Sequence, residues 1–251
     1  KGREVAWVGL ASAESALALF NQAQDLGGGA LTAFELIGQR PMEYAMRHIP
    51  EARPPLEGEW PWQVLMEISS GRSAEDARTL MEHILSAGFE AGQVGDATIA
   101  ASVGHANEFW RLREMLPETQ KAEGTSIKHD ISVPIASIPA FIEQAAKAVA
   151  GVCPEARVVC FGHMGDGNLH YNISQPVGMD GEEFLELYRR MNDAVHDVVR
   201  SFNGSISAEH GIGQLKRDEL IATAPPVATD LMRRVKAAFD PAGIMNPGKV
   251  I

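Results

Sequence analysis

The most informative stretch of the chain lies between residues 160 and 172. It reads Cys160-Phe161-Gly162-His163-Met164-Gly165-Asp166-Gly167-Asn168-Leu169-His170-Tyr171-Asn172. An apolar, β-branched run from Val158 to Gly162 leads into the glycine-rich part, and Leu169 to Ile173 alternates apolar and polar residues. This pattern is typical of two antiparallel strands joined by a tight connection. The stretch therefore predicts a β-hairpin.

Two histidines flank the turn of this hairpin. We expect His163 and His170 to face each other across it, where cross-strand Cβ atoms approach to about 5 Å. Two imidazoles can hold one divalent ion and leave positions open for a carboxylate and a substrate oxygen, as in a catalytic metal site. The alternative is a polar hairpin whose histidines only form hydrogen bonds.

A second polar motif follows downstream and reads Ser207-Ala208-Glu209-His210-Gly211-Ile212-Gly213. Neighbours on a regular strand point to opposite faces, so Glu209 and His210 need an irregular backbone to serve one site, and the glycines permit it. Glu209 would then complete the metal shell, and His210 would remain free as a general base. Taken alone, the motif is equally compatible with a helix start capped by Ser207.

Outward from the hairpin, strands and helices alternate along the chain. The first part predicts strands at 5–10, 31–37, 63–69 and 97–101, with helices at 12–26 and 73–87. A partial second copy predicts strands at 128–133, 157–162 and 169–173, helices at 138–152 and 182–202, and a final helix at 227–239. We expect an α+β fold in which ferredoxin-like units form a large antiparallel sheet with helices on one face, plus a C-terminal helical tail.

Composition narrows the classes of function. The formal net charge of −11 argues against a nucleic-acid partner, because phosphates would be repelled, and the 45% apolar content is ordinary for a folded core. We find no run of about twenty apolar residues and no signal peptide. The two cysteines, Cys153 and Cys160, indicate reduced thiols and a cytoplasmic protein.

The glycine-rich segments do not predict a cradle for nucleotide phosphates. Gly27-Gly28-Gly29 follows a helix and is typical of a C-cap and loop. The glycines of the hairpin precede a strand that carries a histidine, whereas a phosphate cradle requires the start of a helix. We therefore expect no complete nucleotide-binding site among these glycines.

Four motifs, in this order along the chain, carry a family resemblance. They are His163-x-Gly165-Asp166-Gly167-Asn168-x-His170, Ser207 to Gly213, Phe239-Asp240-Pro241 and Asn246-Pro247-Gly248-Lys249. Together they resemble the C-terminal half of the FAD-linked D-2-hydroxyacid dehydrogenases, a family that includes D-lactate, glycolate and D-2-hydroxyglutarate dehydrogenases. The resemblance implies a substrate- and metal-binding cap domain at residues 1–220. It also implies a helical segment at 221–251 that packs on an N-terminal FAD-binding domain absent from the chain.

The resemblance also implies roles for single residues. His163, His170 and Glu209 match ligands of a divalent metal, zinc or manganese; His210 matches the base that takes the substrate hydroxyl proton; Arg113, Lys128 and Asn172 match substrate contacts; and Asn246 matches a flavin contact. Arginine and lysine suit an anionic substrate because a guanidinium offers a planar fork to a carboxylate and an ammonium adds a point charge.

Alternative readings remain for several of these residues. Without the resemblance, Arg113 is a solvated charge on a helix, Lys128 opens a strand, and Asn246 belongs to a turn that closes the last helix. Pro117 stands where some 2-hydroxyglutarate dehydrogenases carry a threonine, and proline has no hydroxyl donor. The sequence therefore does not predict that the substrate is a dicarboxylate.

The function implied is oxidation of a D-2-hydroxy acid to a 2-oxo acid, with hydride transfer to FAD. The chain alone is expected to be inactive without the FAD-binding domain. The expected partners are a small anionic 2-hydroxy acid, that domain and an unidentified electron acceptor, and a homodimer is one assembly the sequence allows. The alternative is a free-standing metal-binding domain that presents its site to a separate flavin subunit or binds 2-hydroxy acids without turnover.

Overall fold

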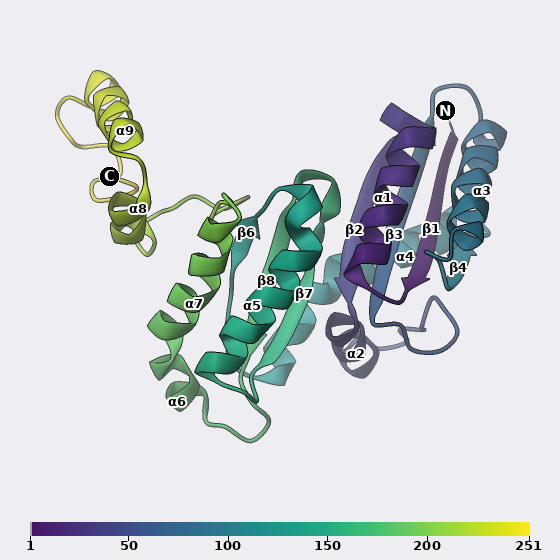
Figure 1. Cartoon of the computed structure of the whole chain (residues 1–251), viewed down its shortest axis with the longest axis horizontal. Helices are drawn as coiled ribbons and strands as arrows, with labels where there is room; N and C mark the ends of the chain where they lie inside the picture. The colour runs from purple at the N-terminus through teal and green to yellow at the C-terminus, as the bar shows by residue number, and fades with distance from the viewer. Residues whose placement is uncertain (1) are drawn as a thin grey trace. The chain divides into compact units, whose positions relative to one another are not determined.

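An eight-stranded antiparallel sheet organises the first part of the chain in the computed structural model, which describes residues 2–251 (Figure 1). The strands are β1 (Gly2–Leu10), β2 (Leu31–Gly38), β3 (Trp62–Ser70), β4 (Asp96–Ile99), β5 (Ser126–Ile127), β6 (Asp130–Ser132), β7 (Arg157–His163) and β8 (Asn168–Ser174). Their order in the sheet is β4-β1-β3-β2-β7-β8-β5, and β6 also pairs with β8. The pairing of β2 with β7 joins the two halves of the sheet.

Two ferredoxin-like units can be traced along the sheet. The helices of the first unit are α1 (Ala13–Gly27) and α3 (Ala74–Glu90), which give the order β1-α1-β2-β3-α3-β4. In the second, α5 (Ile138–Val152), α6 (Gly181–Glu186) and α7 (Tyr188–Ser201) accompany β5 to β8. The predicted α+β class with a large antiparallel sheet is confirmed.

Serine caps fix where three of the helices begin. The hydroxyls of Ser12, Ser73 and Ser102 each accept a hydrogen bond from a backbone N–H three residues later, at 3.0 to 3.1 Å. An extended serine followed by helical residues is the preferred N-cap arrangement. The third of these caps starts α4 (Val103–Thr119), the helix that carries Arg113.

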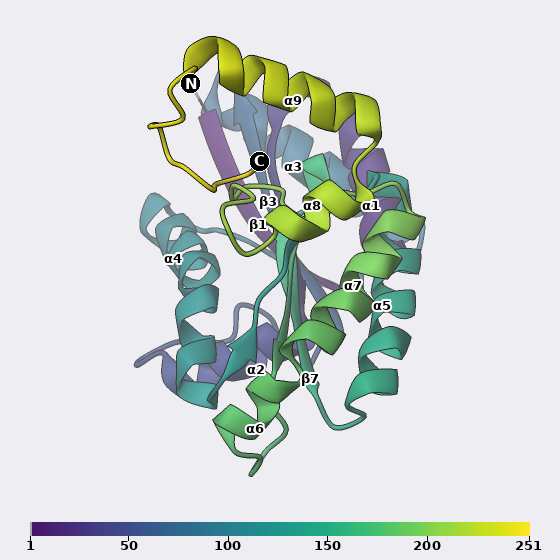
Figure 2. The ribbon, with the colours of Figure 1, turned by 90° about the vertical axis from the view of Figure 1, so that its left-hand side faces the viewer.

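Helices lie on both faces of the sheet. Figure 2 shows α4 on one side of the strands and α5 and α7 on the other. α1, α3, α5 and α7 cover one face, and α2 (Gln39–His48) and α4 cover part of the other. The prediction placed helices on one face only.

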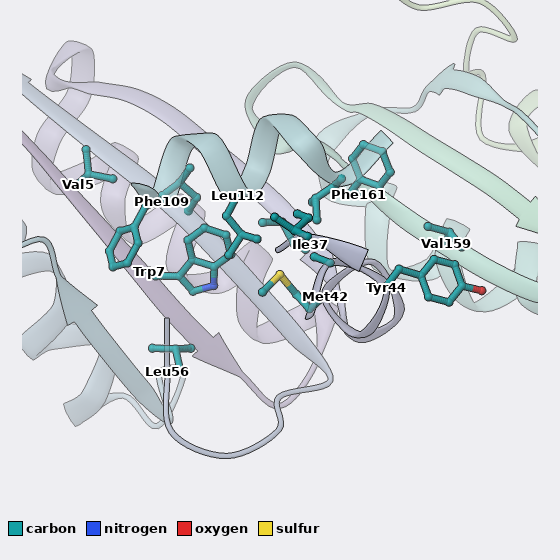
Figure 3. Close-up of a cluster of buried hydrophobic side chains, with 14 of the residues drawn as sticks. Val5, Trp7, Ile37, Met42, Tyr44, Leu56, Phe109, Leu112, Val159 and Phe161 are labelled. Atoms are coloured by element: carbon teal, nitrogen blue, oxygen red, sulfur yellow. The ribbon is translucent and has the colours of Figure 1, made fainter. Parts of the chain in front are cut away.

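The packing of α4 on the sheet is apolar. Figure 3 shows Phe109 and Leu112 of α4 beside Trp7 of β1 and Ile37 of β2, all buried. The rings of Trp7 and Phe109 meet edge to face, with centroids 5.6 Å apart, a geometry that aromatic pairs prefer. This contact fixes α4 against the sheet and so sets the position of Arg113.

One helical stretch of the described residues, Ile135–Val152, is long and apolar enough by composition to cross a membrane, with a mean hydropathy of 1.2. Its apolar side chains Ile138, Phe141 and Val149 are buried, and Phe141 packs against Tyr171 of β8 with centroids 5.4 Å apart. Burial against the sheet explains why these positions of the helix are apolar.

Two predicted elements differ from those in the structure. Within the predicted strand at 128–133 only β6 forms, and β5 lies just before the predicted bounds; between the two, the backbone N–H of His129 donates to Asn172 Oδ1 at 3.1 Å. The predicted helix at 182–202 breaks at Leu187, between α6 and α7.

The chain divides into two compact units after Ile206, earlier than the domain boundary predicted at residue 220. The second unit, Ser207–Ile251, holds α8 (Arg217–Thr223) and α9 (Pro226–Phe239). Its first residues bond to its last ones: Val250 N–H donates to Gly213 O at 2.8 Å. The segment around Glu209 therefore belongs with the C-terminal tail.

Candidate metal and substrate site

The hairpin predicted around residue 165 is present, with a different register from the one expected. The 3-10 turn Met164–Asp166 and Gly167 connect β7 to β8, and His170 lies opposite Phe161. His163, the last residue of β7, lies opposite Glu35 of β2. The two histidines are therefore diagonal neighbours on one face of the sheet, and the expectation that they pair directly is wrong.

The diagonal arrangement still brings the two imidazoles together. Their ring centroids are 6.2 Å apart, and a ring nitrogen of each lies within 4.8 Å of one on the other. His170 also packs on the Phe161 ring at 5.1 Å. Small rotations would let two nitrogens at this separation converge on one divalent ion. The donor set therefore fits a metal such as zinc.

A carboxylate that was not predicted from the sequence stands behind this pair. Glu35 is 5% exposed, and its Oε1 lies 2.8 Å from His163 Nδ1. Its other oxygen, Oε2, accepts from Arg113 Nε at 3.0 Å and lies 2.8 Å from Arg113 Nη2. The available signal was a lone charged residue between Phe34 and Leu36 in a strand that is otherwise apolar at its end. A buried charge in such a strand requires a partner.

The second histidine has a carboxylate nearby as well. His170 Nδ1 lies 3.9 Å from Asp130 Oδ1, and the same oxygen accepts from Asn168 Nδ2 at 2.8 Å. Asn168 also donates to Ile131 O at 3.1 Å, which ties this group to β6. Each hairpin histidine thus has an acidic side chain on its Nδ1 side.

The predicted substrate contacts have different surroundings. Arg113 is buried, in contrast to the solvated charge that the residue alone suggested, and its guanidinium lies 5.1 Å from the Phe161 ring centroid. Asn172 lies two residues beyond His170 on the same face of β8, and its Oδ1 accepts from His129 N–H. Only its NH₂ group then remains to donate to a ligand. Lys128 is exposed, between β5 and β6.

The remaining predicted site residues belong to the second unit. The segment around Glu209 and His210 is neither strand nor helix: Ser207 Oγ donates to His210 O at 2.5 Å, and Gly213 has a φ of +60°. The irregular backbone expected there is present, and the first helix starts later, at Arg217. Asn246 has a φ of +47° and its carbonyl accepts from Lys249 N–H, as in a turn. The roles of Glu209, His210 and Asn246 stay predictions.

The whole chain matches one known family. Residues 1–250 match the model of the C-terminal domain of FAD-linked oxidases. A D-2-hydroxyglutarate dehydrogenase of Stutzerimonas stutzeri (strain A1501) is 39% identical over 222 residues, which are 88% of this chain and 47% of that protein. The mitochondrial D-2-hydroxyglutarate dehydrogenase of Danio rerio is 32% identical over 254 residues, covering 100% of this chain and 45% of the relative. The chain thus spans less than half of the length of each relative.

Solved structures agree on the fold. A structure of p-cresol methylhydroxylase with substrate bound aligns with a TM-score of 0.68 at 12% identity, covering 99% of this chain and 52% of that one. An alkyldihydroxyacetonephosphate synthase aligns with a TM-score of 0.61 at 13% identity, covering 98% and 45%. At such low identity these likenesses concern the fold alone.

Proposed function

Because the chain belongs to the family of FAD-linked oxidases, whose C-terminal domain it matches, we propose that it binds substrate and metal in an FAD-dependent dehydrogenase. The proposed reaction is the oxidation of a D-2-hydroxy acid to a 2-oxo acid. The observation that carries the proposal is the pair His163 and His170 on one sheet face, with Arg113 connected to His163 through Glu35. The relatives named D-2-hydroxyglutarate dehydrogenase support the substrate class.

In this proposal the anionic substrate is held by positive and amide groups. Glu35 accepts a hydrogen bond from Nε of Arg113 and lies 2.8 Å from Nη2 without a hydrogen bond to it, and Nη1 forms no contact with a carboxylate within residues 2–251. Nη1 can therefore donate to the substrate carboxylate, assisted by the Lys128 ammonium and the Asn172 NH₂ group. A planar guanidinium already fixed in place loses little conformational freedom on binding.

His163, His170 and Glu209 are the proposed ligands of a divalent zinc or manganese ion. Such an ion lowers the pKa of a bound hydroxyl group, and FAD supplies the acceptor for the hydride. His210 is proposed to accept the proton of the substrate hydroxyl at a ring nitrogen, because a neutral imidazole has one acceptor nitrogen. Asn246 is proposed to contact the flavin or the domain that binds it.

The second unit is proposed to pack on the FAD-binding domain. None of its apolar side chains is among the buried residues of the described chain, whereas Leu215, Val227, Phe239 and Ile244 are each more than 70% exposed. Exposed apolar clusters of this kind mark interaction surfaces. A unit without a buried apolar core of its own requires such a partner for stability.

The proposal is tested with the full-length protein, by metal analysis and a screen of D-2-hydroxy acids with an artificial electron acceptor. We expect about one divalent ion per chain, consistent with a single site, and reduction of the flavin by a D-2-hydroxy acid. His163→Ala should empty the metal site. His210→Ala should keep the metal and slow flavin reduction by about 10²- to 10⁴-fold, the usual contribution of a general base.

His83→Ala is the matched control, because His83 is exposed on α3 and should change neither quantity. Full metal occupancy in His163→Ala would remove this histidine from the ligand set. Near-normal flavin reduction in His210→Ala would exclude His210 as the base. Metal binding without flavin reduction by any hydroxy acid would favour the alternative of a binding domain.

A further inference from the structure

The carboxylate of Glu35 contacts two residues with proposed roles: His163, a proposed metal ligand, and Arg113, a proposed contact of the substrate. Glu35 Oε1 lies 2.8 Å from Nδ1 of His163, and Glu35 Oε2 lies 2.8 Å from Nη2 of Arg113. Glu35 was not among the residues that the sequence motifs identified. We propose that Glu35 is a positioning residue that orients His163 for the metal and Arg113 for the substrate carboxylate. The inference rests on the proposed function.

The register of the sheet fixes the Glu35 contact with His163. The two residues are directly opposite each other in the antiparallel pair of β2 and β7. Directly opposed side chains have Cβ atoms only about 5 Å apart, so the contact follows from the backbone and needs no unusual rotamer. Glu35 is also 5% exposed, so little water competes for its oxygens.

The contact decides which nitrogen of His163 can bind a metal. A neutral imidazole has one N–H donor and one acceptor nitrogen, and a ring that donates Nδ1–H to a carboxylate presents Nε2 as the acceptor. Metal-binding histidines usually donate their second nitrogen to a carboxylate or carbonyl in this way. Glu35 therefore selects the tautomer in which Nε2 of His163 carries the lone pair that can bind a metal.

The second oxygen of Glu35 serves the substrate side. It accepts a hydrogen bond from Nε of Arg113 and lies 2.8 Å from Nη2, and the guanidinium lies over the Phe161 ring, so two contacts define its orientation. An arginine held by a carboxylate on one edge keeps its remaining donors in a fixed plane. Loss of Glu35 should thus weaken both metal binding and substrate binding, although Glu35 itself is proposed to contact neither the metal ion nor the substrate.

Two substitutions separate these effects. Glu35→Ala removes both contacts and should weaken Zn²⁺ binding by about 10- to 100-fold, as for other residues behind metal ligands, and should also raise KM. Glu35→Gln keeps an amide oxygen for His163 Nδ1–H but turns an NH₂ group toward Arg113. It should therefore restore most of the Zn²⁺ affinity while KM for the hydroxy acid stays high.

Glu67→Gln is the matched control. Glu67 lies on the neighbouring strand β3. Like Glu35, it accepts hydrogen bonds from an arginine and a ring N–H: from Arg3 Nε of β1 at 2.6 Å and from Trp110 Nε1 of α4 at 3.0 Å. It contacts no proposed metal ligand. We expect wild-type Zn²⁺ affinity, measured by competition with a chromophoric chelator, and wild-type KM.

A spectroscopic readout does not depend on the metal or on turnover. In full-length protein labelled with ¹⁵N-histidine and stripped of metal, the ring nitrogen shifts of His163 should report the Nδ1–H tautomer. Glu35→Ala should lose this preference, and Glu35→Gln should retain it. If Glu35→Ala does not fold, the wild type and Glu35→Gln still decide the question.

The two proposals can fail separately. If the wild-type protein binds no Zn²⁺, the proposed metal site is wrong. The tautomer of His163 still tests whether Glu35 orients this histidine. An Nε2–H tautomer in the wild type overturns the inference, as does unchanged Zn²⁺ affinity in a folded Glu35→Ala variant. Equal losses of Zn²⁺ affinity in Glu35→Gln and Glu35→Ala overturn the claim that Glu35 acts through a hydrogen bond to Nδ1.

Discussion

The guanidinium of Arg113 is held on two sides before any ligand arrives. Glu35 binds one edge, and the Phe161 ring lies against the group at 5.1 Å. A buried pair of this kind is costly to break, because a single remaining charge lies in a medium of low dielectric and the loss is about 3 to 5 kcal/mol. The pair therefore acts as one rigid unit, and in the proposed function Arg113 would bind a substrate carboxylate without reorganisation.

Substrate choice should depend on the residue four positions after Arg113. Pro117 lies in the last turns of α4, one helical turn from Arg113 and on the same side of the helix. Pro117→Thr should raise kcat/KM for D-2-hydroxyglutarate by about tenfold, because one hydrogen bond to a charged group contributes about 1.5 kcal/mol. kcat/KM for D-lactate, which lacks the second carboxylate, should not change.

Pro117→Ala separates the hydroxyl group from the helix. Alanine restores the backbone N–H that proline lacks and adds no donor on the side chain. It should leave the ratio of the two kcat/KM values at the wild-type level. A ratio that rises equally in both variants would assign the change to the backbone of α4, and no change in either would place the second carboxylate elsewhere.

At the scale of the elements, the hairpin turn depends on one glycine. Gly167 has a φ of +79°, and a Cβ at this position would lie 2.1 Å from Val133 O. Its carbonyl also accepts from Val133 N–H at 3.1 Å, so the turn cannot move away freely. Gly167→Ala should lower the free energy of unfolding by more than about 3 kcal/mol, since strain and a backbone clash combine.

Gly178→Ala provides the comparison for this prediction. Gly178 has a similar φ of +83°, but a Cβ there meets nothing within 4 Å. Gly178→Ala should lower the free energy of unfolding by about 1 to 2 kcal/mol, the cost of a left-handed conformation alone. Urea denaturation of the two variants measures the difference, and equal losses would show that the contact with Val133 contributes nothing.

The sequence predicts local features of these elements well. Serine caps, apolar periodicity and the glycine-rich turn identify α1, α3 and the hairpin because each signal lies within a few residues. The partner of His163 could not be predicted in this way. Glu35 lies 128 residues away in the sequence, and only the pairing of β2 with β7 brings the two together.

The diagonal placement of the histidines has the same origin. Alternation of residues predicts which side chains share a face, and His163 and His170 do share one. It does not predict the register, because the length of the connection sets where β7 begins to pair with β8. The break between β5 and β6 likewise depends on a distant side chain, Asn172.

At the scale of the whole molecule, Glu123 connects parts of the sheet unit that lie far apart in the sequence. Its carboxylate binds Arg47, His48 Nε2 at 2.7 Å and Arg157 Nη1 at 2.6 Å, which come from α2 and β7. Burial by itself would raise the pKa of Glu123, but hydrogen bonds from His48, Arg157 and Arg47 lower it to about 2. The unfolded chain holds this proton more tightly than the folded one.

This difference predicts a loss of stability in acid. A carboxyl group with a lowered pKa stabilises the fold above its unfolded value, near 4.5, and the contribution disappears as the pH falls toward 2. The shift corresponds to about 3 kcal/mol, a magnitude supported by a side chain that is only 7% exposed. Glu123→Gln should therefore lower the free energy of unfolding by about 3 kcal/mol at pH 7.

The variant and the wild type should converge as the pH is lowered from about 4.5 to about 2, because the wild-type carboxyl group then becomes protonated too. Urea denaturation across this range measures the convergence. Glu143→Gln is the control, since Glu143 pairs with Lys147 on the exposed face of α5, where water and salt screen an ion pair and its contribution to stability is small. If Glu123→Gln and wild type lose stability in parallel from pH 7 to 2, the Glu123 cluster does not govern the acid sensitivity of the fold.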